Sequence, residues 1–270
     1  MIGLYAAVFR AVFKLKLWLP FIVYALLQII VLIVCRSYVN PYIYPILSPI
    51  VSLIEGNNAQ LFGHYPGLFL LMPSVMQWLR LALGILFEGL AIGLTAVLFI
   101  RQFGTGNETM PRLSATFSKW PQLLIVWTII TAIIVALNLI LPKLLAGFLI
   151  GSPRRIAVFD VALRLLGVII YSIFIYAVPS IIVYKNSIMG AFRTSLSFFA
   201  RFPIFSFFLA FLPFILTVPT TYFADKANLI VSKFSPELVF YVLLAGIIID
   251  MIVNYIMTGT VVKFLIDEKK

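Results

Sequence analysis

Glu88 and Asp250 are the residues with the strongest chemical consequences in this chain, because each lies inside a long hydrophobic run. A carboxylate within the hydrocarbon layer of a membrane costs roughly 3 kcal/mol on insertion scales, so it marks a functional site by default. The chemistry that such a pair offers is the binding of a cation, a proton or a polar lipid headgroup.

The two acids also occupy the same position in two similar segments. The segment Leu81-Ala-Leu-Gly84-Ile-Leu-Phe-Glu88 corresponds to Leu243-Leu-Ala-Gly246-Ile-Ile-Ile-Asp250, and a basic residue follows thirteen positions later in each copy, Arg101 and Lys263. At helical rise this separation is roughly 20 Å, which places each carboxylate slightly beyond the midplane of a core about 30 Å thick. We therefore predict duplicated membrane helices that converge at their acids.

Other polar residues share the faces or the equivalent positions of these acids. Asn254 lies one helical turn after Asp250, and Ser172 is at the corresponding place in another hydrophobic run. Near Glu88, the spacing Gly89-x-x-x-Gly93 permits close contact between helices. The candidate intramembrane polar site consists of Glu88, Asp250, Asn254, Ser172 and Arg164.

A structural role competes with this functional hypothesis. Glu88 would then be protonated or paired with Arg164, and Asp250 would bond to Asn254 or to a neighbouring backbone group. Two further polar residues, Gln28 and Asn138, stand alone in their hydrophobic runs. We expect both to form hydrogen bonds between helices.

The sequence offers little for enzymatic catalysis. It contains one histidine and one cysteine, His64 and Cys35, so neither a Ser/His/Asp set nor a Cys/His pair is expected. We also find no cluster of metal ligands and no phosphate-binding glycine loop. The chain is therefore expected to be non-enzymatic, with no metal and no cofactor.

The elements that position these residues are membrane-spanning helices. The chain is 63% hydrophobic and only 11% charged, whereas soluble domains are about 45–50% apolar and about 25% charged. Six continuously apolar runs reach the length of about 20 residues that a spanning helix needs. They are 17–34, 79–100, 120–141, 161–184, 202–222 and 238–265.

The distribution of basic residues predicts the orientation of these spans. One side carries twelve of the twenty Lys and Arg residues against three acidic residues, which marks it as cytoplasmic and places both termini inside. The net charge of +11 then reflects topology and attraction to anionic lipid. Expected partners are membrane lipids and other membrane-protein subunits, and no nucleic acid.

Three short amphipathic stretches precede the odd-numbered spans, and each is followed by a proline, at Pro20, Pro121 and Pro203. Proline suits the first turn of a helix, so these prolines predict where the three spans begin. The stretches read as helices lying in the cytoplasmic interface. Their basic residues are Arg10, Lys14, Arg112, Lys119, Arg193 and Arg201.

These stretches divide the single membrane domain 1–270 into three predicted parallel repeats, each an interfacial helix plus a helix pair. The units are 1–101, 102–185 and 186–270. The first unit differs from the other two because it contains a long external loop, 37–78, which is apolar and nearly uncharged. Such a segment is expected to form short helices on the outer surface or to cap the bundle.

One segment carries a family resemblance. Pro179 followed by Ser187-x-x-x-Ala191-x-x-x-Ser195 resembles a motif of six-helix bacterial inner-membrane proteins. That superfamily includes the membrane domain fused to some glycerophosphodiester phosphodiesterases, together with stand-alone relatives of unknown role. The resemblance implies the six-helix fold over essentially the whole chain and a bacterial inner-membrane location. The catalytic histidines of those hydrolases have no counterpart here.

The same region resembles, more faintly, the coupling loop of ATP-binding-cassette permeases, through Gly190-Ala191 and Leu212-Pro213. The function expected first is a non-enzymatic inner-membrane protein, either a subunit of a membrane complex or a component of lipid or envelope transport. A small proton- or cation-coupled transporter that uses Glu88 and Asp250 is the alternative, and a permease-like subunit is a third.

Overall fold

The computed structural model describes residues 2–104, 113–149 and 152–269, and every regular element in these ranges is a helix. Six of the described segments are long and apolar enough to cross a membrane, which confirms the all-α membrane fold with six spans. They are Leu15–Arg36, Gly67–Phe103, Trp120–Leu144, Arg154–Val183, Pro203–Asp225 and Leu238–Lys269.

Four of the spans are single helices, and two are interrupted. The single helices are α2 (Leu15–Arg36), α7 (Trp120–Leu144), α12 (Pro203–Asp225) and α14 (Leu238–Lys269). In the second span a π-helical turn, η2 (Gly84–Glu88), separates α4 (Gly67–Leu83) from α5 (Gly89–Phe103). The fourth span breaks at Ile175–Tyr176, between α9 (Pro153–Phe174) and α10 (Ala177–Val183).

The predicted helix starts are only partly right. Pro121 and Pro203 lie in the first turn of α7 and α12, as expected for proline. Pro20 lies inside α2 instead, because that helix already begins at Leu15. The second and fourth spans also begin well before 79 and 161, at Gly67 and Arg154.

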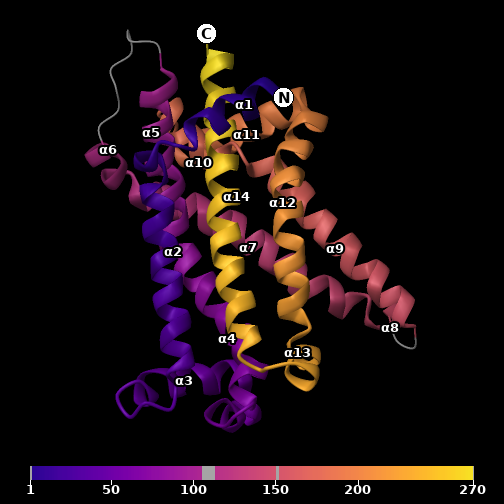
Figure 1. The fold of residues 1–270 in the computed structure, drawn as a ribbon. Coiled ribbons are helices and arrows are strands. Elements are labelled where there is room, and N and C mark those ends of the chain that lie inside the picture. The colour runs from indigo at the N-terminus through magenta and orange to yellow at the C-terminus, as the bar shows by residue number, and fades with distance from the viewer. Residues whose placement is uncertain (1, 105–112, 150–151, 270) are drawn as a thin grey trace.

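A short helix precedes each odd-numbered span, and all three gather at one end of the bundle (Figure 1). They are α1 (Ile2–Ala11), α6 (Leu113–Ser118) and α11 (Ile188–Arg201). The last turns of α14 lie at the same end, which we call the terminal end. The order of short helix, span and returning span recurs three times along the described parts of the chain.

The opposite end, which we call the cap end, is built from the segment predicted as an external loop. Most of this segment is helical: α3 (Tyr44–Glu55) and the 3-10 helix η1 (Gly56–Gly63) pack on α4. The boundary at residue 78 is wrong, because the segment from Gly67 onward belongs to the second span. Val51, Phe62 and Met72 are fully buried where these helices meet.

The Ser187-x-x-x-Ala191-x-x-x-Ser195 motif has a clear structural role at the terminal end. Ser187 caps the start of α11 by accepting a hydrogen bond from the Gly190 amide at 3.3 Å. Ala191 and Ser195 are buried where α11 packs on α9 and α10. The Ser195 hydroxyl donates to the Ile173 carbonyl at 2.7 Å, just where α9 ends.

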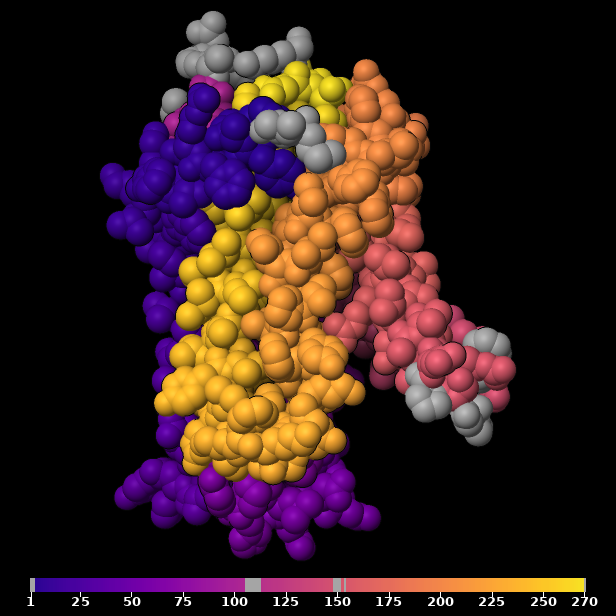
Figure 2. All heavy atoms as spheres, turned by 45° about the vertical axis from the view of Figure 1, so that its right-hand side comes forward, coloured from indigo at the N-terminus to yellow at the C-terminus, as the bar shows by residue number. Residues whose placement is uncertain are grey.

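Helix α14 occupies the centre of the molecule and packs against α12, α5, α2 and α4. By contrast, α7, the short α8 (Ala146–Leu149) and α9 form a hairpin that leans away from the other helices as it approaches the cap end (Figure 1). The remaining short helix, α13 (Ala227–Lys233), packs against α4 and α14. In Figure 2 the far part of α9 stands apart from α12 and α13, and a hollow separates them.

Candidate functional site

The structure brings Glu88 and Asp250 into one cavity, as the duplicated frame predicts, but it gives them different partners. Glu88 ends the π-helical turn η2 and accepts two hydrogen bonds. The Tyr24 hydroxyl donates to its Oε2 at 3.3 Å, and the Asn254 Nδ2 donates to its Oε1 at 3.0 Å. Both donors are neutral, and no ion pair joins Glu88 to any other residue within the described ranges.

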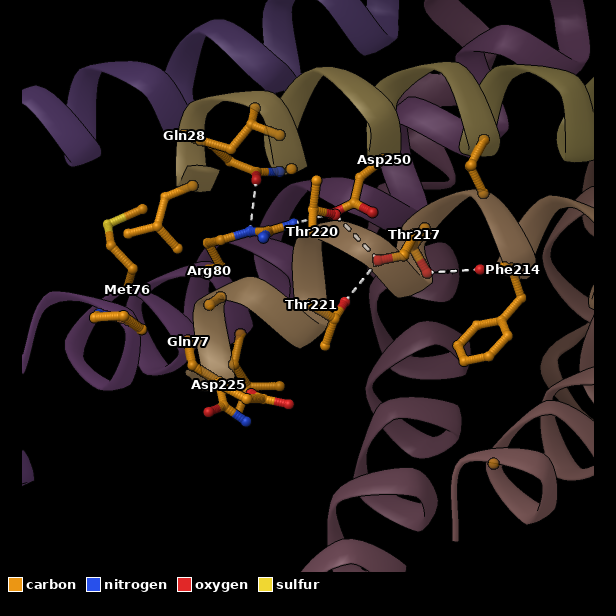
Figure 3. A pocket seen from close by; sticks show the side chains of 18 of the residues that line it. Gln28, Met76, Gln77, Arg80, Phe214, Thr217, Thr220, Thr221, Asp225 and Asp250 are labelled. Atoms are coloured by element: carbon orange, nitrogen blue, oxygen red, sulfur yellow. Dashed lines mark hydrogen bonds and ion pairs between the residues drawn. The ribbon is translucent and has the colours of Figure 1, made fainter. Parts of the chain in front are cut away.

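Asp250, in contrast, forms an ion pair with Arg80 (Figure 3). The Arg80 Nη2 donates to Asp250 Oδ2, while its Nε donates to the Gln28 Oε1 at 2.9 Å. The two charged side chains keep 30% and 28% of their surface exposed. A partly solvated ion pair with a third hydrogen-bonded residue is held in a defined geometry and still remains accessible to a ligand.

Two of the predicted pairings are therefore wrong. Asn254 does share the face of Asp250, but its amide bonds to Glu88 on the neighbouring span. Arg164 does not pair with Glu88, because its Nη2 lies 2.6 Å from the Asp225 Oδ2 at the end of α12. This second ion pair connects the leaning helix α9 to α12.

The hydrogen bonds form two layers that cross the same three spans. Each span contributes one residue to each layer. In α2 and in α14 the two residues are one helical turn apart, and in the second span they lie on either side of the start of η2. The layer of the ion pair is Gln28, Arg80 and Asp250, and the layer of the lone carboxylate is Tyr24, Glu88 and Asn254. These contacts fix the rotation of α2, the second span and α14 relative to one another.

Gly84 leaves the space that the Glu88 layer needs. A Cβ atom at Gly84 would lie 3.1 Å from the Glu88 Oε2 and 3.4 Å from the Tyr24 hydroxyl. At the matching position Gly246, a Cβ would meet Thr220 at an ordinary 3.7 Å. Gly84 and Gly246 therefore occupy matching sequence positions but have different structural roles. Gly84 also begins η2, and π-helical turns of this kind are frequent at functional sites.

The predicted close contact at Gly89-x-x-x-Gly93 is confirmed. A Cβ at Gly89 would lie 2.9 Å from the Leu123 carbonyl oxygen of α7, and one at Gly93 would lie 2.7 Å from the Leu123 side chain. Small residues of this kind let helix backbones approach closely. The second span is therefore held against α7 just beyond Glu88.

Both layers face a cavity of about 1060 Å³, slightly larger than the range of about 300–1000 Å³ that is usual for ligand sites. Its six charged lining residues are three cations and three carboxylates. These are Arg80, Arg164 and Lys226, with Glu88, Asp225 and Asp250. The lining of the cavity thus contains as many acidic as basic residues.

The two sides of the cavity differ in chemistry. The side formed by α2, α4 and α14 carries both hydrogen-bonded layers. The side formed by α7 and α9 also carries Asn138, Arg164 and Tyr171, but most of its lining is apolar. The apolar lining residues there are Ile134, Val135, Leu139, Leu163, Gly167 and Val168. The cavity thus has a polar wall and an apolar wall, and the hollow between α9 and α12 lies beside the apolar one.

Helix α12 lines the cavity with a row of threonines, shown in Figure 3. Thr217 donates its hydroxyl to the Phe214 carbonyl at 2.8 Å, and Thr220 and Thr221 donate to the Thr217 carbonyl at 3.0 and 2.9 Å. Their oxygens keep lone pairs for a ligand that carries hydrogen-bond donors. This row was not anticipated from the sequence, although the spacing of Thr217, Thr220 and Thr221 was an available signal for a polar helix face.

Ser172 does not join the site. It is fully buried, and its hydroxyl donates to the Ile169 carbonyl of its own helix at 2.6 Å. Its neighbour Tyr171 lines the cavity in its place. The prediction that Ser172 belongs to the polar site is therefore wrong, because the rotation of α9 turns Tyr171 toward the cavity.

The two isolated amides behave differently from one another. Gln28 makes the predicted bond between helices, to Arg80. Asn138 lines the cavity but donates to the Ile134 carbonyl of its own helix at 2.8 Å, so its predicted bond between helices is wrong.

The predicted interfacial cations are mostly exposed at the terminal end. This holds for Arg10, Lys14, Arg193 and Arg201, while Arg112 lies outside the described residues. Lys14 donates to the Gln102 side chain at 2.8 Å, and Arg201 pairs with Glu268 at 3.2 Å. These four residues remain available to a charged surface.

Lys119 is the exception among the interfacial cations. It is half-buried and donates to the Ile181 carbonyl at 2.8 Å. Burial, with a smaller contribution from the nearby Lys185, lowers the pKa of its ammonium group. Its role is therefore at least partly structural, since it satisfies a carbonyl near the end of α10.

Within the described ranges, no group of three or more His, Cys, Asp or Glu residues is arranged so that it could hold a metal ion. Comparison of the chain with protein-family models, with curated proteins and with solved structures found no match. The function must therefore be argued from the geometry of the cavity.

Proposed function

We propose that this chain is a non-enzymatic membrane protein that takes a lipid from the bilayer into its cavity, as a component of lipid or envelope transport. The observation that carries the proposal is the cavity itself, which has a charged, hydrogen-bonded wall facing an apolar wall within the spans. An amphipathic molecule matches this division, because each of its parts meets surface of its own kind.

The hollow beside the far part of α9 supports a route from the membrane (Figure 2), and the Arg164–Asp225 ion pair joins α9 to α12 next to it. A lipid entering there would lay its acyl chains along α7 and α9 and would bring its headgroup to the wall of α2, α4 and α14. The acyl chains would move from one apolar environment to another, so their transfer contributes little free energy. Hydrogen bonds and ion pairs at the polar wall must therefore offset the cost of moving the headgroup off the membrane surface.

The basic residues support an orientation with the terminal end in the cytoplasm. The cavity then lies toward the outer half of the membrane, because Asp225 and α13 line it at the cap end. The family resemblance supports a bacterial inner membrane as its location. In this arrangement the protein would handle lipid of the outer leaflet.

The proposal is tested by filling the cavity without disturbing the fold. Gly167 lines the cavity, and a Cβ placed there would meet nothing within 4 Å. Gly167→Trp is therefore expected to displace the ligand, and native mass spectrometry of the purified protein should show loss of a retained lipid. Gly147→Trp is the matched control, because Gly147 lies on α8 away from the cavity and is equally open. Equal lipid retention by both variants would contradict the proposal.

A proton- or cation-coupled transporter is the second candidate, and one observation favours it. Glu88 carries its carboxyl group within the spans among neutral donors, whereas Asp250 is already paired with Arg80. Coupling would then depend mainly on Glu88 rather than on both acids. If Glu88→Gln with Asp250→Asn left a pH-dependent transport activity intact in a folded protein, this candidate would be excluded.

A further inference from the structure

The ion pair in the cavity has unused hydrogen-bonding capacity. Arg80 has five N–H donors, of which its described bonds to Gln28 and Asp250 engage only part. Asp250 bonds through Oδ2, and its other oxygen has no hydrogen-bond partner in the ranges that the structure describes. Both side chains are partly exposed toward the cavity. The pair can therefore open toward a ligand while Gln28 continues to hold the guanidinium.

The charges of the cavity restrict which ligand can open it. An anion alone would bind Arg80 and leave Asp250 without its countercharge, and a partly buried charge without a countercharge is unfavourable. A cation alone would leave Arg80 unpaired in the same way. A ligand that carries one charge of each sign replaces the internal pair with two new pairs and leaves neither residue uncompensated.

We propose, resting on the lipid-binding function above, that the ligand is a membrane lipid with a zwitterionic headgroup of a phosphate diester and an ammonium group. The phosphate binds the Arg80 guanidinium, whose planar fork matches phosphate oxygens. The ammonium group binds Asp250, with Glu88 in the adjacent layer as a second acceptor. Thr217 and Thr220 offer further acceptor oxygens from α12.

The same headgroup chemistry exists in soluble phosphodiesters. The apolar wall of α7 and α9 favours the lipid, because a soluble compound would leave that wall in contact with water. A ligand with acyl chains covers this wall and uses the side opening toward the bilayer.

The test compares lipids that share acyl chains and differ in headgroup charge. The delipidated chain in detergent micelles is mixed with phosphatidylethanolamine or phosphatidylglycerol, and native mass spectrometry measures the bound fraction. We expect a preference of about tenfold for phosphatidylethanolamine. Asp250→Asn should reverse this preference toward phosphatidylglycerol, because Arg80 then lacks a countercharge. Arg80→Gln with Asp250→Asn removes both charges together, so it should fold normally and show no headgroup preference.

Three outcomes would overturn the inference. Equal binding of the two lipids, unchanged by Asp250→Asn, would refute the zwitterionic headgroup while leaving lipid binding in place. Loss of the preference in Asp250→Asn without its reversal would refute the assignment of the phosphate to Arg80. Competition by free glycerophosphoethanolamine as strong as that of the whole lipid would point to a soluble ligand. Failure of the lipid-binding function itself is recognised separately, by equal lipid retention in Gly167→Trp and Gly147→Trp.

Discussion

At the scale of single residues, the site depends on how two acids are compensated. Asp250 has a countercharge in Arg80, and Glu88 has two neutral donors. A paired charge and a hydrogen-bonded carboxyl respond differently to substitution. Removal of one partner of an ion pair is costly, whereas removal of both leaves no orphan charge.

The first prediction concerns the Arg80–Asp250 pair. Arg80→Ala should lower the free energy of unfolding by about 2–3 kcal/mol, less than the 3–5 kcal/mol typical of a fully buried pair, because both side chains are about one-third exposed. Arg80→Leu with Asp250→Leu should stay within about 1 kcal/mol of the wild type. Denaturant unfolding in detergent, followed by circular dichroism, measures both variants, and equal losses would contradict the assigned pairing.

Sequence reasoning found the two acids and the face that Asp250 shares with Asn254, but it did not find their partners. Arg80 was not among the predicted site residues, although it lies two turns before Glu88 and faces the same cavity. The spacing of Tyr24 and Gln28 by one turn was an available signal for a polar face on α2. The rotation of each helix about its axis decides which neighbouring helix a polar face contacts. The π-helical turn changes this rotation in the second span, and the hydropathy of the sequence does not predict such a turn.

At the scale of the elements, two contacts determine how the second span and α11 are held. Gly89 and Gly93 let the second span approach α7, and Ser187 satisfies the first turn of α11. The residues of both contacts stood out in the sequence, as the Gly89-x-x-x-Gly93 spacing and as part of the Ser187-x-x-x-Ala191-x-x-x-Ser195 motif. The ends of the second span were not visible, because the apolar residues before 79 resemble a membrane-surface loop as closely as they resemble a helix.

The second prediction concerns the glycine contact. Gly89→Ala should destabilise the protein by about 1–3 kcal/mol, because the new methyl group would lie 2.9 Å from a backbone oxygen of α7. Gly167→Ala should be neutral or stabilising by up to about 1 kcal/mol, since alanine favours the helix and meets nothing there. Thermal unfolding of the two variants in one detergent compares them directly. Equal melting temperatures would argue against close packing of the second span on α7.

The third prediction concerns the start of α11. Ser187→Ala removes the acceptor for the Gly190 amide and should cost about 1 kcal/mol. Ser197→Ala, on the exposed face of the same helix, is the control and should cost less than about 0.5 kcal/mol. Denaturant midpoints distinguish the two. A larger loss in Ser197→Ala would contradict the assigned cap.

At the scale of the whole molecule, we propose a helix bundle whose terminal end faces the cytoplasm and whose cavity opens sideways into the membrane. The six spans followed from composition alone, since runs of this length and hydrophobicity have few other uses. The leaning of α7 and α9, which creates the opening, did not follow, because hydropathy does not encode helix tilt. The sideways opening is therefore the feature that required the structure.

The fourth prediction concerns orientation. Cys35 is fully buried, so labelling of an introduced cysteine has little background from the native thiol. Leu53→Cys lies on the cap end with 87% of the native side chain exposed, and Met189→Cys lies on the terminal end with 77% exposed. A membrane-impermeant maleimide should label Leu53→Cys in intact cells and Met189→Cys only after permeabilisation. The reverse pattern would place the cavity in the other leaflet.

The most direct test of the central claim is photocrosslinking from inside the cavity. A photoreactive amino acid in place of Thr220, which lines the cavity on α12 beside Arg80 and Asp250, reports what occupies the space (Figure 3). We expect irradiation in native membranes to give an adduct with the mass of a whole phospholipid, and we expect Gly167→Trp to abolish it while Gly147→Trp leaves it unchanged. An adduct that persists in Gly167→Trp, or no lipid adduct in any background, would contradict the account.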